Sequence, residues 1–246
     1  MQHFNWKLII RMNILMLHSV GLWPKNDEIY KPNLYTFYAM ISIVMIMGSH
    51  NFFQLMNIFF VYKDLETVAE TIFITATDLL ISVKMYFFVR NMGILKELMI
   101  KLNSGIFQPR NSQQIELVWP RINIWKKTYV VYWLSVGTTV FVWTIFPFLD
   151  NSVKTHRLPF SAWYPYDAKI SPFYESTYLY QVIGIWFLTV AAVNMDTLIA
   201  ALMMYTATQC DILCDDLKNL RENFYEVFIT CVKHHQDIIR FAEKSN

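Results

Sequence analysis

The chain has 246 residues, of which 55% are apolar and 16% are charged, and its formal net charge is +2 at neutral pH. A soluble domain has about a quarter of its residues charged, because its surface faces water. The composition therefore excludes an ordinary soluble domain. The small net charge argues against a nucleic-acid partner, and the six glycines form no glycine-rich phosphate-binding loop.

The N-terminal segment, residues 1–33, mixes apolar and basic side chains. Trp6 and Ile9 stand beside Lys7 and Arg11, a pattern typical of an amphipathic helix in a membrane interface. The two basic residues also interrupt the first apolar run, which argues against a cleavable signal peptide. We expect this segment to form an interfacial helix on the cytoplasmic side.

Four apolar stretches are long enough to cross a bilayer as helices, which takes about 20 residues each. They are Leu34–Phe60, Val68–Val89, Tyr129–Leu149 and Tyr180–Tyr205. The first and third stretches contain no Asp, Glu, Lys or Arg. The sequence predicts an all-α membrane protein whose transmembrane bundle occupies residues 34–205.

Three charged residues inside these spans need an explanation. Asp78 lies near the midplane of its span, where an ionised carboxylate costs at least ~2.5 kcal/mol. Lys84 lies about 8 Å from the inner end, within reach of the interface for its long stem. Asp78 and Lys84 point to different faces of one helix, whereas Lys84 and Asp196 lie at similar depths. We expect Lys84 and Asp196 to pair across two helices.

The distribution of Lys and Arg predicts the orientation. The N-terminal segment has four, the connection after the first span one, residues 90–128 seven, residues 150–179 three, and the tail after Tyr205 five. Alternate segments therefore hold sixteen against four, and the richer set is cytoplasmic by the positive-inside rule. Both ends of the chain are expected on the cytoplasmic side.

Two of the cytoplasmic segments carry apolar residues at helical spacing. After the second span these are Ile94, Leu95, Leu98, Met99 and Leu102. In residues 206–246 they are Cys210, Leu213, Cys214, Leu217 and Leu220, followed by Phe224, Val227, Phe228, Cys231, His235, Ile238, Ile239 and Ala242. We expect the second span to continue past the membrane and residues 206–246 to form a helical anchor segment. The last stripe is unfinished at Asn246, which suggests part of a longer protein.

The outer loop, residues 150–179, is rich in aromatic residues and holds three prolines, which preclude a regular helix through most of it. Two interpretations stay open. The aromatic side chains can form a belt at the outer interface, or the loop can form an ordered lid over an opening among the helix ends.

At this point the sequence resembles the insect odorant receptor family. The outer loop, with residues 158–167 reading LPFSAWYPYD, resembles the second extracellular loop of that family. Leu22-Trp23-Pro24 resembles the motif that precedes its first span. The run Asn194-Met195-Asp196 resembles the end of its fourth helix, and residues 234–241 resemble the approach to its fifth.

The resemblance implies a seven-helix bundle, of which this chain holds four spans. It implies a ligand-gated cation channel component for olfaction at the plasma membrane, with a volatile, mostly apolar ligand. It also implies a tetramer that includes a shared co-receptor and has its pore along the seventh helix. Gustatory receptors share this topology and are the main alternative. A G-protein-coupled receptor fragment, a transporter fragment and a membrane enzyme are weaker alternatives.

The candidate ligand-binding residues lie on the outer halves of three spans, at spacings that place them on one helix face. They are Phe73, Ile74 and Thr77 in the second span, Val136, Thr139 and Trp143 in the third, and Ile183, Trp186, Phe187 and Val190 in the fourth. A pocket for a volatile molecule is lined by such aromatic and aliphatic side chains with a few polar groups. In the resembled family the pocket is formed by the outer halves of these helices and the sixth.

The sequence predicts neither an enzyme nor a cofactor or metal site. His234, His235, Asp237 and Cys231 imitate a metal site on one helix face. Zinc requires four well-placed ligands, and cytosolic helices carry such residues by chance. No nucleophile has a recognisable base beside it.

Overall fold

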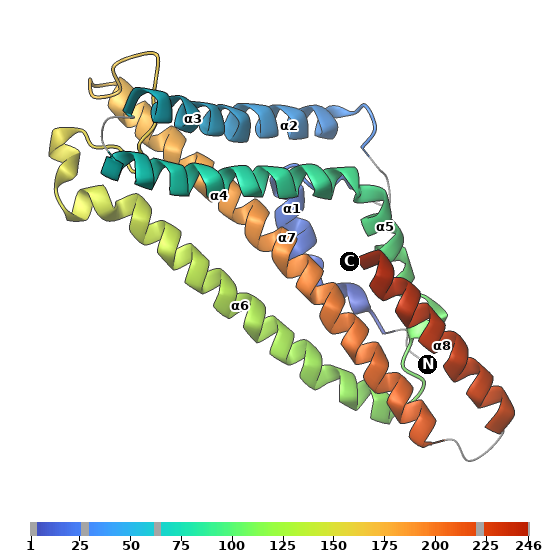
Figure 1. Ribbon diagram of the computed structural model, residues 1–246. Helices are drawn as coiled ribbons and strands as arrows, with labels where there is room; N and C mark the ends of the chain where they lie inside the picture. Colours follow the sequence, from blue (N-terminus) through green and yellow to red (C-terminus); the bar gives the residue numbers. More distant parts are fainter. Residues whose placement is uncertain (1–3, 26–29, 62–64, 220–223, 246) are drawn as a thin grey trace.

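The computed structural model describes residues 4–25, 30–61, 65–219 and 224–245, and this part of the chain is helical without strands (Figure 1). Four helical segments in it are long and apolar enough to cross a membrane. They are Leu34–Val61, Thr71–Arg90, Ser112–Leu149 and Phe173–Lys218. Each contains most or all of one predicted span, so the prediction of an all-α protein with four membrane helices is confirmed.

The first span consists of α2 (Leu34–Ser42), a π-helical segment (Ile43–Gly48) and α3 (Ser49–Val61). Asn33 begins it, because its side chain accepts a hydrogen bond from the backbone N–H of Thr36 at 2.8 Å. The second span is α4 (Leu65–Arg90), which lies antiparallel to α3 (Figure 1).

The second span is followed by a further helix, as the sequence predicted. A turn at Asn91 separates α4 from α5 (Met92–Lys101). The predicted stripe divides here, because Leu95 and Leu98 are buried whereas Ile94 is exposed. The helical continuation is therefore confirmed, with a change of direction at Asn91.

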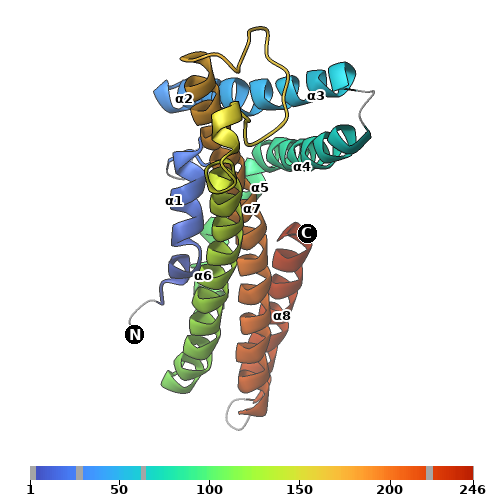
Figure 2. The same cartoon turned by 90° about the vertical axis from the view of Figure 1, so that its left-hand side faces the viewer.

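Two long helices, α6 (Ser112–Leu149) and α7 (Phe173–Lys218), form the centre of the structure. The 46 residues of α7 span about 69 Å at 1.5 Å per residue, more than twice the ~30 Å hydrocarbon thickness. Both helices therefore extend far beyond a membrane at one end. Contacts with α1, α4, α6 and α8 all converge on α7 (Figures 1 and 2).

The N-terminal segment packs against this long extension of α7. It consists of a 3-10 turn (Trp6–Ile9) and α1 (Arg11–Ser19). The fully buried Trp6 side chain donates from Nε1 to the carbonyl oxygen of Phe107 at 3.1 Å, and its ring meets Tyr205 edge-on. The predicted helix is present, and its position in a membrane interface stays a prediction.

The Leu22-Trp23-Pro24 motif connects this segment to the first span. Gly21 precedes it at φ 82°, and a Cβ at this position would lie 2.8 Å from Cα of Ala39. Glycine is therefore required both by the left-handed backbone and by the close approach of α2. Trp23 and Pro24 contact the buried Lys96 of α5, whose Nζ lies 4.7 Å from the Trp23 ring and donates to the Pro24 carbonyl.

The last helix, α8 (Phe224–Ser245), runs antiparallel along α7 (Figure 2). Its buried side chains are Cys231, His234, Ile238 and Phe241. The predicted stripe was partly wrong, because it contained the exposed residues Phe224, Phe228, His235 and Ile239. The face is set by its partners: His234 pairs with Gln209 at 3.1 Å, and the Phe241 ring packs on Phe107 and Tyr205. Leu220 lies outside the described residues.

This helix makes the stability of the chain depend on pH. Burial lowers the pKa of His234 below its ordinary value of 6.5, and the positive charge of Arg110 lowers it further. The unfolded chain therefore binds more protons than the folded chain below pH about 6.5, so stability present above that pH is lost as the pH falls. We expect the unfolding temperature of the purified chain to drop by several degrees between pH about 7.5 and about 5.5. His234→Gln should weaken this dependence, whereas His235→Gln at the exposed neighbour should leave it intact; an equal drop in all three proteins would contradict the assignment.

Candidate ligand site

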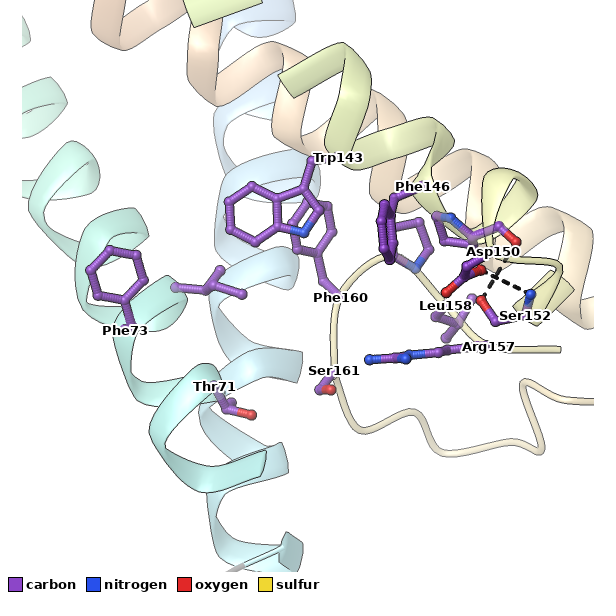
Figure 3. Close-up of a pocket in the computed structure, with 13 residues that line it drawn as sticks. Thr71, Phe73, Trp143, Phe146, Asp150, Ser152, Arg157, Leu158, Phe160 and Ser161 are labelled. Atoms are coloured by element: carbon purple, nitrogen blue, oxygen red, sulfur yellow. Dashed lines mark hydrogen bonds between the residues drawn. The ribbon is translucent and has the colours of Figure 1, made fainter. Parts of the chain in front are cut away.

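A cavity of about 310 Å³ lies at the end of the bundle where α6 turns into the loop before α7 (Figure 3). We call this end of the bundle the loop end. The cavity lies between α4, α6 and the loop, and it is walled by aromatic, aliphatic and a few polar groups. Its lining residues are Thr71, Phe73, Ile74, Trp143, Phe146, Pro147, Asp150, Ser152, Arg157, Leu158, Pro159, Phe160 and Ser161. The predicted residues Phe73, Ile74 and Trp143 are among them.

A tight turn at the end of α6 brings the loop back over the cavity. Asp150 follows the last helical residue, and its carboxylate accepts a hydrogen bond from the backbone N–H of Ser152 at 2.9 Å. Hydrogen bonds from the Ser152 side chain and backbone hold the pKa of Asp150 below its usual range. Asn151 and His156 have positive φ angles of 60° and 53°. These two residues flank a 3-10 turn, and together they reverse the chain direction.

The loop is anchored to α7 through Gln181, which is fully buried. Gln181 accepts a hydrogen bond from the backbone N–H of Phe160 at 3.0 Å and donates to its carbonyl oxygen at 2.9 Å. It also donates to the Tyr164 hydroxyl at 3.0 Å. A single amide therefore fixes both polar groups of the Phe160 backbone, so the loop is held in one position over the helix ends.

Aromatic contacts complete this attachment. Phe160 is buried with its ring centroid 5.5 Å from that of Trp143. Farther along the loop, Trp163 stacks on Phe60 of α3 at 5.2 Å, and its backbone N–H donates to the Phe53 carbonyl at 3.0 Å. The loop is thus packed on α3, α6 and α7, an arrangement that fits the interpretation of an ordered lid better than that of a belt.

The other predicted ligand residues lie outside this cavity. On α4, Thr77 lies about one turn from Ile74, toward the middle of the bundle. On α6, Thr139 and Val136 lie about one and two turns from Trp143, also toward the middle. On α7, Ile183 is half-exposed and Trp186 lies against Gly137 of α6. Phe187 and Val190 belong to the core or pack on it. Of the predicted residues, the structure therefore brings together only Phe73, Ile74 and Trp143 around the cavity, and it places the α7 residues elsewhere.

The residues missed by sequence reasoning are mostly those of the loop itself. Arg157, Leu158, Phe160 and Ser161 line the cavity, whereas the sequence left open whether the loop covers an opening or forms an aromatic belt. Thr71 and Phe146 are also new. Phe146 lies one helical turn after Trp143, a spacing that could have identified it.

Two of the three intramembrane charges pair with each other. Lys84 Nζ lies 2.9 and 3.0 Å from the two carboxylate oxygens of Asp196, so the expected contact across helices is present. Asp78 is buried, and His50 Nε2 of α3 lies 3.5 Å from its Oδ2. Sequence reasoning missed His50, although it is the only histidine in the first span. Among the described residues, no three or more His, Cys, Asp or Glu side chains converge as metal ligands.

The profile described as 7tm Odorant receptor matches residues 64–246, which is about three quarters of the chain. The chain belongs to the odorant receptor family. Odorant receptor Or1 of Anopheles gambiae is 26% identical over 202 residues, covering 79% of this chain and 46% of that receptor.

Solved structures support the fold. The olfactory receptor OR5 from Machilis hrabei, in complex with eugenol, superposes with a TM-score of 0.74 at 21% identity, covering 97% of this odorant receptor chain and 64% of that chain. A second structure of OR5 gives a TM-score of 0.73 at 19% identity. At this identity the likeness concerns the fold alone. The chain spans about half the length of Or1 and about two thirds of OR5.

Proposed function

We propose that this chain is part of an odorant receptor subunit and that the cavity at the loop end binds a volatile, mostly apolar molecule. The observation that carries the proposal is the wall of the cavity. Phe73 and Ile74 of α4, Trp143 and Phe146 of α6 and Phe160 of the loop surround about 310 Å³. Aromatic and aliphatic walls with a few polar groups are typical of small-molecule sites, and the eugenol complex of the related OR5 supports a ligand of this size.

The orientation proposed from the sequence places the cavity outside the cell. The positive-inside rule puts the N-terminal segment, α5 and α8 on the cytoplasmic side, so the loop end faces outward. The long extensions of α6 and α7 support this orientation, because α1 and α8 pack at the end of the bundle opposite the cavity. A volatile molecule would then reach the cavity from the extracellular side of the plasma membrane.

Channel activity and assembly belong to the same proposal. Seven spans, a cation pore and a tetramer with a co-receptor follow from the family resemblance. In such an assembly, ligand binding opens the channel only if the ligand contacts the open state better than the closed state. Phe160 and its neighbours in the loop are placed to supply this difference, because they touch the cavity and are fixed to α7 through Gln181.

Replacement of Trp143 with alanine tests the ligand site. Loss of one aromatic wall should weaken binding of 1-octanol or eugenol about tenfold, because it removes roughly 1–2 kcal/mol of apolar contact. Binding is measured by equilibrium dialysis of the purified chain in detergent with radiolabelled ligand.

The same helix provides a matched control for this experiment. Trp119 has the same exposure as Trp143, 41% against 42%, and lies near the start of α6, far from the cavity. Trp119→Ala should bind both ligands like the original chain. Equal affinities in the two variants, or a loss shared by both, would contradict the proposed site.

A further inference from the structure

The interface between α3 and α4 is polar although both helices belong to membrane spans. We call the side chains that meet there the polar seam. Its members are His50, Asn51, Gln54 and Asn57 of α3 and Thr71, Thr75, Asp78 and Ser82 of α4. All are buried except Ser82, which is half-buried. Hydrogen bonds cross the interface from Asn51 to Ser82 at 2.7 Å and from Asn57 to Thr71 at 3.3 Å.

Holding two membrane helices together explains only part of the polar seam. Polar side chains do stabilise helix pairs in membranes through such hydrogen bonds. However, four buried oxygens of the seam have no hydrogen-bond partner within the described residues: Asn51 Oδ1, Gln54 Oε1, Thr75 Oγ1 and Asp78 Oδ2. Buried polar atoms are nearly always paired, because an unpaired one costs about 1–3 kcal/mol. The polar seam therefore contains more hydrogen-bond acceptors than its own donor groups can pair with.

Asp78 carries the most strongly accepting of these oxygens. Its nearest cationic candidate is His50, whose Nε2 lies 3.5 Å away, beyond ordinary hydrogen-bond distance. The same nitrogen lies 3.0 Å from Gln54 Nε2. Gln54 therefore competes with Asp78 for this ring nitrogen. Asp78 Oδ2 therefore remains open to a donor from elsewhere.

The polar seam adjoins the cavity at two points. Thr71 belongs to the seam and also lines the cavity. Phe160 stands between the two spaces, with its ring centroid 5.5 Å from Trp143 on the cavity side and 6.4 Å from His50 on the seam side. Gln181 fixes the backbone of Phe160, so the Phe160 ring is held at the junction of the cavity and the polar seam.

We propose that the polar seam is a second compartment of the ligand site, that it accepts the hydrogen-bond donor of an alcohol or amine, and that the Phe160 ring closes it. The apolar body of the ligand occupies the cavity against Phe73 and Trp143, and its hydroxyl or ammonium group reaches Asp78. The inference rests on the proposed function, because it requires that a volatile molecule binds in the cavity at all. It adds that the receptor selects for donor groups and not only for shape.

A pair of probes that differ only in the donor tests this inference. The purified chain in detergent is titrated with 1-octanol and with its methyl ether, which has the same alkyl chain and no donor. A hydrogen bond to a carboxylate makes 1-octanol bind at least about tenfold more tightly than the ether. Octylammonium, as a third probe, shows whether the seam prefers a charged or a neutral donor, and preference for either donor over the ether supports the proposal.

Two variants test whether Asp78 and Phe160 determine the preference for 1-octanol over the ether. Asp78→Leu should reduce the preference for 1-octanol over the ether to about threefold or less, while Asp237→Leu on the distant α8 should leave it unchanged. Phe160→Ala removes the ring that closes the seam and leaves Asp78 in place, so the preference should rise about threefold or more. This second variant keeps the proposal testable if Asp78→Leu does not fold.

The outcomes separate this inference from the proposed function. Equal binding of 1-octanol and the ether to the original chain overturns the inference and leaves the apolar ligand site intact. An unchanged preference in both Asp78→Leu and Phe160→Ala also overturns it. Failure of all three probes to bind overturns the inference together with the proposed site.

Discussion

Replacement of Trp6 with alanine is expected to lower the free energy of unfolding by about 3–5 kcal/mol. Trp6 is fully buried where the N-terminal segment meets the extension of α7, and its ring packs edge-on against Phe4 and Tyr205. The substitution leaves a cavity the size of an indole ring. It also leaves the Phe107 carbonyl oxygen without the donor that Trp6 Nε1 provides at 3.1 Å. Both effects follow from the same substitution, so the measured loss contains both.

Thermal unfolding of the purified chain, followed by circular dichroism in detergent, measures this loss. Trp119→Ala is the matched control, because that side chain is 41% exposed and makes only peripheral ring contacts, with Phe4 and with Lys126. The control should cost less than about 1 kcal/mol. Equal losses in both variants would show that Trp6 does not hold the N-terminal segment to α7.

Replacement of Gln181 with leucine should release the loop from the bundle. Leucine has nearly the same volume, but it removes the three hydrogen bonds to the Phe160 backbone and the Tyr164 hydroxyl. These groups are buried, and each unpaired group costs about 1–3 kcal/mol. We therefore expect a loss of roughly 2–4 kcal/mol, which appears mainly as local opening of the loop because α7 itself keeps its helical hydrogen bonds.

Limited trypsin digestion measures this opening. Lys154, Arg157 and Lys169 lie in the loop and are the cleavage sites. Gln181→Leu should be cut there at least tenfold faster than the original chain, whereas Gln113→Leu, at an exposed position of α6, should be cut at the original rate. The affinity for 1-octanol should fall with the loop released, because Phe160 forms one wall of the cavity. Unchanged cleavage would mean that the aromatic contacts alone hold the loop.

The sequence by itself determined the membrane class of this protein and its four helical spans. The reason is that a bilayer requires about 20 apolar residues with internally paired backbone groups, so each stretch such as Leu34–Val61 is visible without knowledge of its neighbours. The helical continuation after the second span and the helix in the C-terminal segment were also predicted. The contact between Lys84 and Asp196 could be predicted, because opposite charges at equal depth in a membrane are stabilised by pairing with each other.

Only the tertiary structure decided which faces of these helices meet. In a membrane protein, apolar side chains face lipid as well as protein, so hydropathy does not mark the inward face of a span. For this reason the sequence grouped Ile183 and Phe187 with Trp143, although the α7 residues lie away from the cavity. On α8, one helix position separates the expected His235 from the buried His234, and the choice depends on Gln209 of another helix.

The candidate site itself depended on the loop, and a loop has no periodicity from which its contacts can be read. Phe160 reaches the cavity because Gln181, twenty-one residues away, binds its backbone. His50 and Asp78 meet because α3 and α4 lie antiparallel in one register. Such pairings are set by packing between distant segments. The sequence shows that polar residues are present in the spans, and the fold decides what they face.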